Sequence, residues 1–405
     1  MEVLRSALRL GLTSFGGPVA HIGYFRREYV GRRGWLDDRS FAELVVLCQS
    51  LPGPASSQLG IAIGTLRAGH VGGVAAWLGF TLPSALLLAV FAALATAADV
   101  AAAPWAHGLK LAAVAVVMQA VWLMRRNLAP DVPRRLVAMA AMAAALAWPS
   151  LVTPIAIIGG GAAAGLLLSR AGKPGDEGGR SARVPLDEAT QPTTVPAAVT
   201  ISRRSGAVAL VLFVVLLAGL PSLLAATGSQ LVAVADTFYR AGALVFGGGH
   251  VVLPLLHGSV VTTGWLDESR FVAGYGAAQA VPGPLFAFAG FLGAAVSVGP
   301  GSLAGGALAL VTIFLPGMLL VWAALPFWAT IRHSRQLQGA LAGSGAAVVG
   351  LLAAALYDPI WLAAVGTPAD AGLALAGFLG LAAFGMPPLL VVAAAMLVTQ
   401  VAPGL

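Results

Sequence analysis

The chain consists largely of apolar stretches that are each about as long as a membrane is thick. About 20 apolar residues cross a bilayer as an α-helix. Only 10% of the 405 residues are charged, against about 25% in soluble proteins. The alternating pattern of barrel strands is missing, so the sequence predicts an all-α integral membrane protein. The predicted spans are Val71–Ala97, Trp105–Met124, Arg135–Trp148, Leu151–Leu168, Gly206–Ala226, Leu303–Phe327, Leu337–Leu356, Ala371–Gly385 and Pro387–Val401.

Cysteine content and charge narrow the class of protein further. Cys48 is the single cysteine, so no disulfide can form within the chain. Arg5 and Arg9 interrupt the apolar residues of the first segment, and we therefore expect no secretory signal. The 23 basic residues outnumber the 16 acidic ones but are scattered between the spans. This pattern is typical of cytoplasmic loops, and we expect no nucleic-acid partner.

A long internal repeat runs through the sequence. The motif FGGPVAHI at Phe15–Ile22 corresponds to FGGGHVVL at Phe246–Leu253. The longer motif GWLDDRSFAELVVLCQSLPGP at Gly34–Pro54 corresponds to GWLDESRFVAGYGAAQAVPGP at Gly264–Pro284. Matches of this length at the same spacing indicate that one unit has been duplicated.

The repeat divides the chain into three parts. Residues 1–170 form the first copy and residues 228–405 the second. Residues 171–227 contain a stretch rich in glycine, proline and charge, which is typical of a flexible linker and which we expect in the cytoplasm. The same part adds the apolar run Gly206–Ala226, one transmembrane helix without a counterpart in the first copy.

Basic residues alternate between equivalent loops of the two copies. The loop at 26–39 carries five arginines, whereas its counterpart at 257–270 carries only Arg270. The next loop reverses this bias, since 96–104 has no basic residue and its counterpart at 329–336 carries Arg332 and Arg335. Four arginines occur at 125–135, and no basic residue occurs in the counterpart at 357–370. Because basic loops stay in the cytoplasm, the copies are predicted to lie in opposite orientations. Inverted repeats are typical of secondary transporters, which bind substrate near the midplane.

Each copy contains two predicted helix breaks, one at FGG and one at PGP. The flanking segments are about half a bilayer long, so PGP is expected at the tip of a re-entrant hairpin. Broken helices at membrane depth are tolerated only where they are buried in protein or line a wet cavity. We expect all four breaks to meet at one central site. The alternative for PGP is a simple packing kink.

We expect the central site to bind an anion. A helix that begins at Ala55 points unpaired N–H groups and the positive end of its dipole toward the break. Ser56, Ser57 and Gln58 add hydrogen-bond donors there, while the second copy has only apolar residues at Leu285–Phe288. The site is therefore predicted to be polar on one side and apolar on the other.

Arg9 and Arg240 each precede an FGG motif by six residues. A guanidinium group suits a doubly charged oxyanion, and buried arginines in membranes are usually functional. The alternatives are that these side chains reach the membrane interface and that Arg240 pairs with Asp236, one helical turn away. The predicted substrate-binding residues are Arg9, Gly16, Gly17, Pro52, Gly53, Pro54, Ser56, Ser57, Gln58, Arg240, Gly247, Gly248, Gly249, Pro282, Gly283 and Pro284.

Three residues are candidates for proton coupling, namely His21, Glu43 and His250. A histidine can carry a proton near neutral pH, although a structural role is the alternative for both histidines. The acidic pairs after the two GWL motifs, which begin at Asp37 and Asp267, precede predicted helices and are expected to cap them.

These motifs resemble those of a known family. RLGLTSFGGP, GWLDDRSF and QSLPGPASSQLGIAIG are similar to the signature of the first domain of the chromate ion transporter (CHR) family, and FGGGHVVLP and AAQAVPGPLFAFAGFLG to that of the second. The resemblance covers nearly the whole chain and is to the long two-domain type. It implies a multi-pass carrier of the cell (inner) membrane that exports chromate and confers chromate resistance, with sulfate as a related oxyanion.

The residues alone predict a secondary carrier for an inorganic anion in the lipid bilayer. No carboxylate cluster, HExxH motif or nucleotide-binding loop is present in the sequence, so we expect no enzyme activity, no catalytic residues, no metal and no cofactor. A passive anion channel is the remaining alternative. Oligomeric state is open, and a homodimer is one assembly that the sequence allows.

Overall fold

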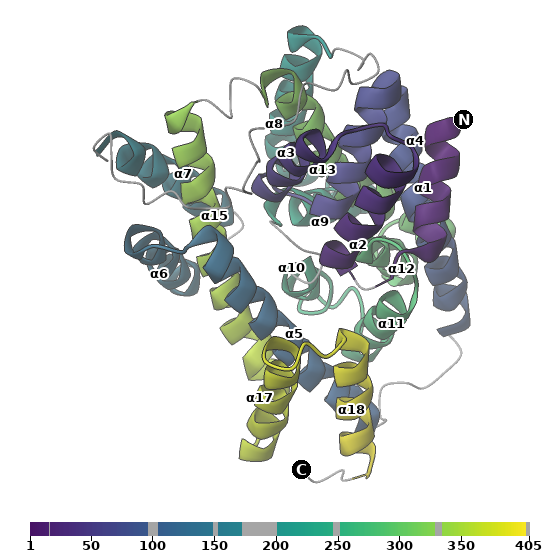
Figure 1. Cartoon of the computed structure of the whole chain (residues 1–405). Coiled ribbons are helices and arrows are strands. Elements are labelled where there is room, and N and C mark those ends of the chain that lie inside the picture. Colours follow the sequence, from purple (N-terminus) through teal and green to yellow (C-terminus); the bar gives the residue numbers. More distant parts are fainter. Residues whose placement is uncertain are drawn as a thin grey trace.

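The protein is a bundle of helices in which chain segments far apart in sequence lie side by side (Figure 1). The computed structural model describes residues 1–15, 17–95, 104–148, 153–171, 201–245, 252–328 and 334–401, and no β-strand occurs among them. The α-helices are α1 (Glu2–Thr13), α2 (Gly17–Phe25), α3 (Asp38–Ser50), α4 (Ala55–Ala95), α5 (Pro104–Leu128), α6 (Val132–Ala147), α7 (Thr153–Ala171), α8 (Arg203–Thr227), α9 (Gln230–Leu244), α10 (Val252–Val260), α11 (Glu268–Ala280), α12 (Phe288–Ala295), α13 (Ser302–Ala324), α15 (Arg335–Ala355), α16 (Leu362–Ala364), α17 (Pro368–Ala382) and α18 (Pro388–Val401). Short π and 3-10 turns are η1 (Arg26–Arg32), η3 (Leu285–Ala287), η4 (Leu325–Phe327) and η5 (Leu356–Trp361).

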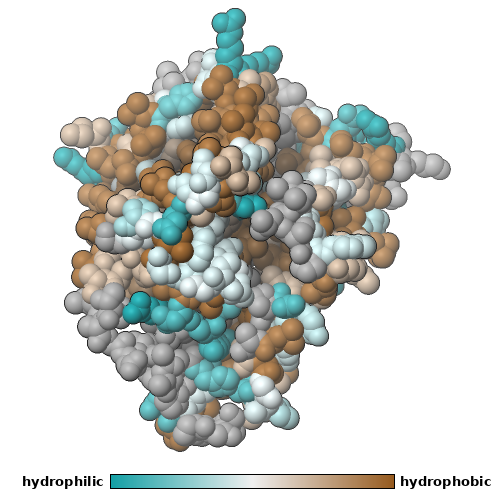
Figure 2. Space-filling view, turned by 180° about the vertical axis from the view of Figure 1, so that it is seen from behind, coloured by the Kyte–Doolittle hydropathy of each residue, from teal (hydrophilic) through white to brown (hydrophobic). Residues whose placement is uncertain are grey.

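Long apolar helices confirm the predicted all-α class and support a membrane protein. Five segments of the described chain are long and apolar enough to cross a bilayer, namely Ala55–Ala93, Lys110–Leu128, Arg203–Thr227, Leu303–Phe327 and Arg335–Asp358. Figure 2 shows wide stretches of apolar surface on one face of the molecule. On α8 the side chains of Val208, Val211 and Val215 are exposed. Surfaces of this extent are unusual in soluble monomers and fit contact with lipid.

Helix α4 is a tight hairpin of two arms rather than one straight rod. Ala68 and Gly69 have non-helical backbone angles, and they separate a first arm (55–67) from a second arm (70–95). Gly64 and Gly72 face each other across the turn, with no room for a Cβ on either. The first arm is therefore a half-length helix, as predicted for the segments that flank the PGP motif.

The second copy contains an equivalent hairpin formed by α12 and α13. There Gly293 and Gly305 meet backbone to backbone in the same manner. In each copy, the helix that ends before the FGG motif, α1 or α9, packs on the longer arm of that copy's hairpin. Gly11 of α1 lies against the Phe80 carbonyl, and Gly242 of α9 lies against the Ile313 carbonyl. Glycine is required at such crossings because any Cβ would overlap the opposing backbone.

The later helices of each copy pack against helices of the other copy. Helix α5 packs against α17 and α18, which come from the second copy, while α15 packs against α6 and α7, which come from the first. Figure 1 shows α5 and α15 crossing near the middle of the molecule. Small residues permit the contact between α7 and α15, since Gly161 and Gly165 of α7 lie against Gly343 and Gly339 of α15.

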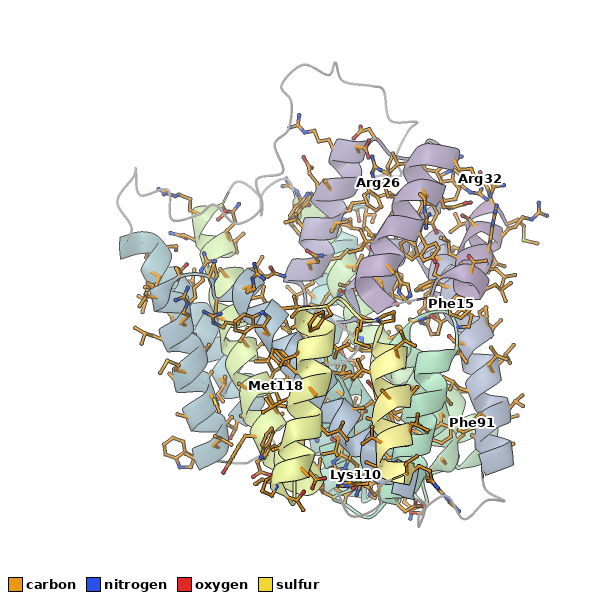
Figure 3. The ribbon with its side chains drawn as sticks, turned by 60° about the horizontal axis from the view of Figure 1, so that its bottom comes forward. Phe15, Arg26, Arg32, Phe91, Lys110 and Met118 are labelled. Atoms are coloured by element: carbon orange, nitrogen blue, oxygen red, sulfur yellow. The ribbon has the colours of Figure 1, made fainter. Side chains whose placement is uncertain are left out.

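Charged residues gather toward the two ends of the bundle. Figure 3 shows Arg26 and Arg32 toward one end and Lys110 at the other, with Phe15 at an intermediate height. Phe15 is the first residue of the first FGG motif, so this motif begins between the two charged ends of the bundle in this view.

Candidate functional site

The two PGP turns have the same backbone geometry. Gly53 has a φ of 122° and Gly283 a φ of 109°, in a region that side-chain-bearing residues rarely adopt. Each turn follows a helix that ends in extended backbone, at Leu51 after α3 and at Val281 after α11. The turn then leads directly into the next helical segment, at Ala55 in the first copy.

Each PGP turn is hydrogen-bonded to the other copy. The Gly53 amide donates to the Val245 carbonyl at 2.5 Å, and the Gly283 amide donates to the Ser14 carbonyl at 2.9 Å. Ser14 ends α1 and Val245 ends α9, so both acceptors come immediately before an FGG motif. The structure thus brings each PGP turn to the edge of the other copy's FGG break.

Close packing reinforces this reciprocal arrangement. A Cβ on Gly53 would lie 3.1 Å from the Gly317 Cα, and one on Gly283 would lie 2.9 Å from the Ser84 Oγ. Gly317 follows Pro316 inside α13, and Ser84 follows Pro83 inside α4. Both turns therefore rest against the proline-containing helix of the opposite copy.

The first turn of α4 carries three buried polar side chains. Ser56, Ser57 and Gln58 are 4%, 2% and 0% exposed. The Gln58 Nε2 donates to the Pro52 carbonyl at 2.6 Å, which ties this side chain to the PGP turn. The Ser57 Oγ and the Gln58 Oε1 have no hydrogen-bond partner among the described residues. Unpartnered buried polar atoms cost free energy, so this helix start is a candidate site for a ligand.

Further buried polar atoms surround the same helix start. His21 on α2 is 1% exposed, and its Nδ1 lies 3.3 Å from the Ser56 Oγ. The His21 Nε2, the Ser14 Oγ and the Thr81 Oγ1 are also buried without a partner in the described part of the chain. The His21 ring packs edge-on against Phe80, the neighbour of Thr81. The polar cluster, defined as Ser14, His21, Ser56, Ser57, Gln58 and Thr81, thus joins α1, α2 and both arms of α4.

The corresponding part of the second copy is apolar. Counted from the FGG and PGP motifs, Val245 stands for Ser14 and Phe286 for Ser56. The Leu-Pro pairs at Leu82 and Leu315 align Phe314 with Thr81. All three are buried, and the Phe286 and Phe314 rings lie 5.7 Å apart. The structure therefore agrees with the predicted contrast between a polar first copy and an apolar second copy.

Three charged residues were predicted to take part in substrate binding or proton coupling. In the structure they either contact residues outside the polar cluster or are exposed. Arg9 is exposed on α1. Arg240 on α9 is mostly buried and forms an ion pair with Asp236, the pairing that the sequence offered as the alternative to anion binding. Glu43 is partly buried on α3, with its carboxylate 3.5 Å from Arg39. Their roles in binding or coupling stay predictions.

Several predicted site residues lie outside the described part of the chain, namely Gly16, Gly247, Gly248, Gly249 and His250. Gly17 is described; it begins α2 with a φ of 78°. The expected helix caps are confirmed, since Asp37 accepts from the Ser40 amide and Asp267 from the Arg270 amide.

Sequence reasoning missed Ser14, Thr81 and a buried carboxylate, Glu28. Glu28 is 7% exposed and accepts hydrogen bonds from Ser6, Arg32 and Arg33. It fixes η1 to α1 at the arginine-rich end of the molecule, near Arg32 in Figure 3. Ser14 could have been noticed because it directly precedes the first FGG motif, but no pattern singles out Thr81 or distinguishes Glu28 from a loop carboxylate.

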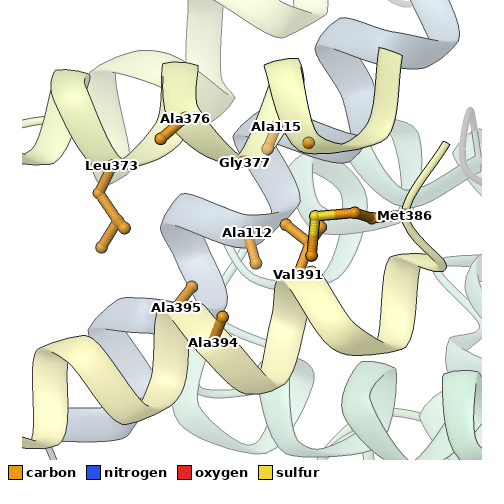
Figure 4. Close-up of a pocket in the computed structure, with 10 residues that line it drawn as sticks. Ala112, Ala115, Leu373, Ala376, Gly377, Met386, Val391, Ala394 and Ala395 are labelled. Carbon is orange, nitrogen blue, oxygen red and sulfur yellow. The ribbon is translucent and has the colours of Figure 1, made fainter. Parts of the chain in front are cut away.

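An apolar cavity lies elsewhere, between α5, α17 and α18 (Figure 4). Its volume is about 160 Å³, and its lining is Ala112, Ala115, Leu373, Ala376, Gly377, Gly380, Met386, Val391, Ala394 and Ala395. These side chains offer no hydrogen-bond donor, so the cavity is unsuited to an anion. Among the described residues, no three His, Cys, Asp or Glu side chains gather as metal ligands would.

Comparison with known proteins identifies the family. The sequence profile named chromate transporter matches residues 1–166 and 232–399, which together are most of the chain. The chain belongs to the chromate transporter family. The resemblance inferred from the motifs is thereby confirmed, and the matched segments nearly coincide with the two predicted copies.

Individual members of the chromate transporter family are similar to the chain over most of its length. A chromate transport protein of Pseudomonas aeruginosa is 28% identical over 365 residues, covering 87% of this chain and 79% of that protein. A chromate transport protein of Cupriavidus metallidurans is 28% identical, with 86% and 80% covered. A probable chromate transport protein of Synechococcus elongatus is 27% identical, with 86% and 81% covered. No solved structure matches the chain.

Proposed function

We propose that this protein is a secondary carrier that moves chromate across the cytoplasmic membrane. The observation that carries the proposal is the polar cluster at the first turn of α4, where the breaks of both copies meet. Membership of the chromate transporter family supports transport rather than enzyme chemistry, and the relatives of P. aeruginosa and C. metallidurans are named for chromate. The long apolar helices support a multi-pass membrane location.

The cluster suits a tetrahedral oxyanion. The first N–H groups of a helix have no partner within the helix and carry the positive end of its dipole. Serine hydroxyls and the Gln58 side chain can add neutral donors around the same point. Such donors recognise an oxyanion by its geometry and do not distinguish chromate from sulfate by charge. Sulfate is therefore expected to compete with chromate for the site.

We infer that transport proceeds by alternating access of two inverted copies. The opposite loop charges predict the inversion. The reciprocal bonds of Gly53 to Val245 and of Gly283 to Ser14 support a two-fold relation between copies, because in such an interface each contact occurs twice with the partners exchanged. Helix α9 has 15 residues and is about 22 Å long, which is shorter than the bilayer core of about 30 Å. The inversion of the two copies requires that this segment does not cross the membrane fully.

The charge of the loops predicts the orientation of the protein in the membrane, and export is the direction that we propose. The end that carries Arg26 and Arg32 would face the cytoplasm under the positive-inside rule, and export would then relieve the cell of chromate and confer resistance. Arg240 keeps guanidinium donors beyond its bond to Asp236, and we propose that it helps to hold the anion from the second copy. Arg9, exposed on α1, would act earlier by attracting anions.

Chromate uptake into proteoliposomes of purified protein tests the function. We expect saturable uptake that sulfate reduces and that responds to an imposed gradient. Ser57→Ala should weaken the apparent affinity about tenfold, because a hydrogen bond to a charged group contributes about 1.5–3 kcal/mol. Ser222→Ala, at an exposed serine on α8, is the matched control and should leave affinity unchanged. Uptake no greater than in empty liposomes would refute the proposal.

A further inference from the structure

The polar cluster contains one titratable side chain, His21. Its ring is 1% exposed and touches the start of α4 through Ser56. The backbone carbonyl of Ser14 lies close to the ring, and Nε2 has no hydrogen-bond partner among the described residues. Only the Ser56 hydroxyl therefore separates the His21 ring from the proposed anion position.

Among the described residues, the charged groups on the elements that pack against α2 have other partners or are exposed, so none of them is a fixed counter-charge for a proton on His21. Helix α2 packs against η1 and α4. The charged groups of η1 have their own contacts: Arg26 with Asp38, Arg27 over Tyr24, and Glu28 with Arg32 and Arg33. On α4, Arg67 pairs with Glu2 and His70 contacts Ser205. On α1, the nearby polar groups are Ser14 and, on the exposed face, Arg5 and Arg9.

Ser56 transmits the protonation state of the ring. A neutral imidazole whose Nδ1 lacks a proton accepts a hydrogen bond, and Ser56 then donates its hydroxyl proton to His21. A protonated imidazole donates at both nitrogens, so Nδ1 donates to the Ser56 Oγ instead. The Ser56 hydroxyl proton is then free to point at a ligand. Adding one proton to His21 therefore adds a donor for the anion and a positive charge beside it.

We propose that His21 takes up a proton when the oxyanion binds at the start of α4 and that Ser56 relays the change, so that proton and anion bind together. This inference rests on the proposed function. Linkage makes the effect reciprocal: the anion raises the proton affinity of the site, and the proton raises the anion affinity by the same factor. A carrier built in this way moves one fewer negative charge per chromate than the bare dianion would carry.

The test is the chromate affinity of purified protein at several pH values from about 4 to 8, a range that spans the titration of buried and exposed histidines, for wild type and His21→Gln. Chromate itself takes up a proton in this range, but that change affects both proteins equally and cancels in the ratio of affinities. We expect the ratio of the wild-type chromate affinity to that of His21→Gln to rise as the pH falls, by at most about tenfold per pH unit for one proton.

Variants of the relay and of a remote histidine make the result specific. Ser56→Ala should lose the same pH-dependent advantage as His21→Gln, whereas Ser56→Thr, which keeps the hydroxyl, should retain it. His107→Gln, at a half-exposed histidine that pairs with Asp370, should match wild type at every pH. Because Ser56→Ala probes the relay from the other side, the test holds even if His21→Gln fails to fold.

Two outcomes would overturn the inference, and they are distinguishable. An affinity ratio between wild type and His21→Gln that stays constant with pH, while both bind chromate, refutes the coupling and leaves the carrier intact. Wild-type protein that binds no chromate at any pH refutes the proposed function, and the coupling with it.

Discussion

Replacing Gly53 with alanine tests whether the PGP turn is a packed junction between the two copies. At a φ of 122°, a residue with a Cβ carries strain of about 1–3 kcal/mol. The new Cβ would also lie 3.1 Å from the Gly317 Cα and 2.8 Å from the Gln58 Nε2. The Gln58 amide can move only by giving up its bond to Pro52, and the Gly317 backbone has no side chain to rotate. Overpacking of this kind costs about 1–3 kcal/mol more.

A second glycine separates the two contributions. Gly34 has a φ of 58°, and a Cβ added there would have no neighbouring atom within 4 Å, so Gly34→Ala should cost only the backbone term of about 1–2 kcal/mol. We expect Gly53→Ala to lower the melting temperature in detergent clearly more than Gly34→Ala and to reduce chromate uptake. Gly283→Ala should behave like Gly53→Ala, because its Cβ would meet the Ser84 Oγ. Equal losses at Gly53 and Gly34 would refute the junction.

Other predictions concern the buried charges. Glu28→Gln should destabilise the protein by about 3 kcal/mol in detergent unfolding, because it removes the carboxylate that lies closest to the largely buried Arg33. Asp38→Asn, in an exposed pair, should cost less than about 1 kcal/mol. Similar losses of stability in both variants would contradict this role of Glu28. Asp236→Asn should lower the melting temperature by removing the counter-charge of Arg240. Arg240→Lys should weaken chromate binding if its forked donors hold the anion, and unchanged affinity would remove Arg240 from the site.

Local features of the fold could be predicted from the sequence because their causes are local. Proline and glycine set the PGP turns, and the caps at Asp37 and Asp267 follow from their place before helices. The pair of Asp236 and Arg240 follows from their spacing of one helical turn. The half-length first arm of α4 was likewise visible in its flanking breaks.

Contacts between distant segments could not be predicted. The glycines of α7 and α15 show that these helices can approach closely, but not that they choose each other. For the same reason the sequence showed Ser56, Ser57 and Gln58 together and missed Ser14 and Thr81, which α1 and the second arm of α4 bring to the same place. Glu28 was missed because burial of a carboxylate in an arginine-rich loop depends on tertiary packing.

A structure of the purified protein determined with bound chromate tests the central claim most directly. We predict the anion at the first turn of α4, in contact with the Ser57 hydroxyl and the Gln58 side chain, and between the PGP turns at Gly53 and Gly283. Chromate bound elsewhere, with Ser57 and Gln58 satisfied by other protein groups, would contradict the claim.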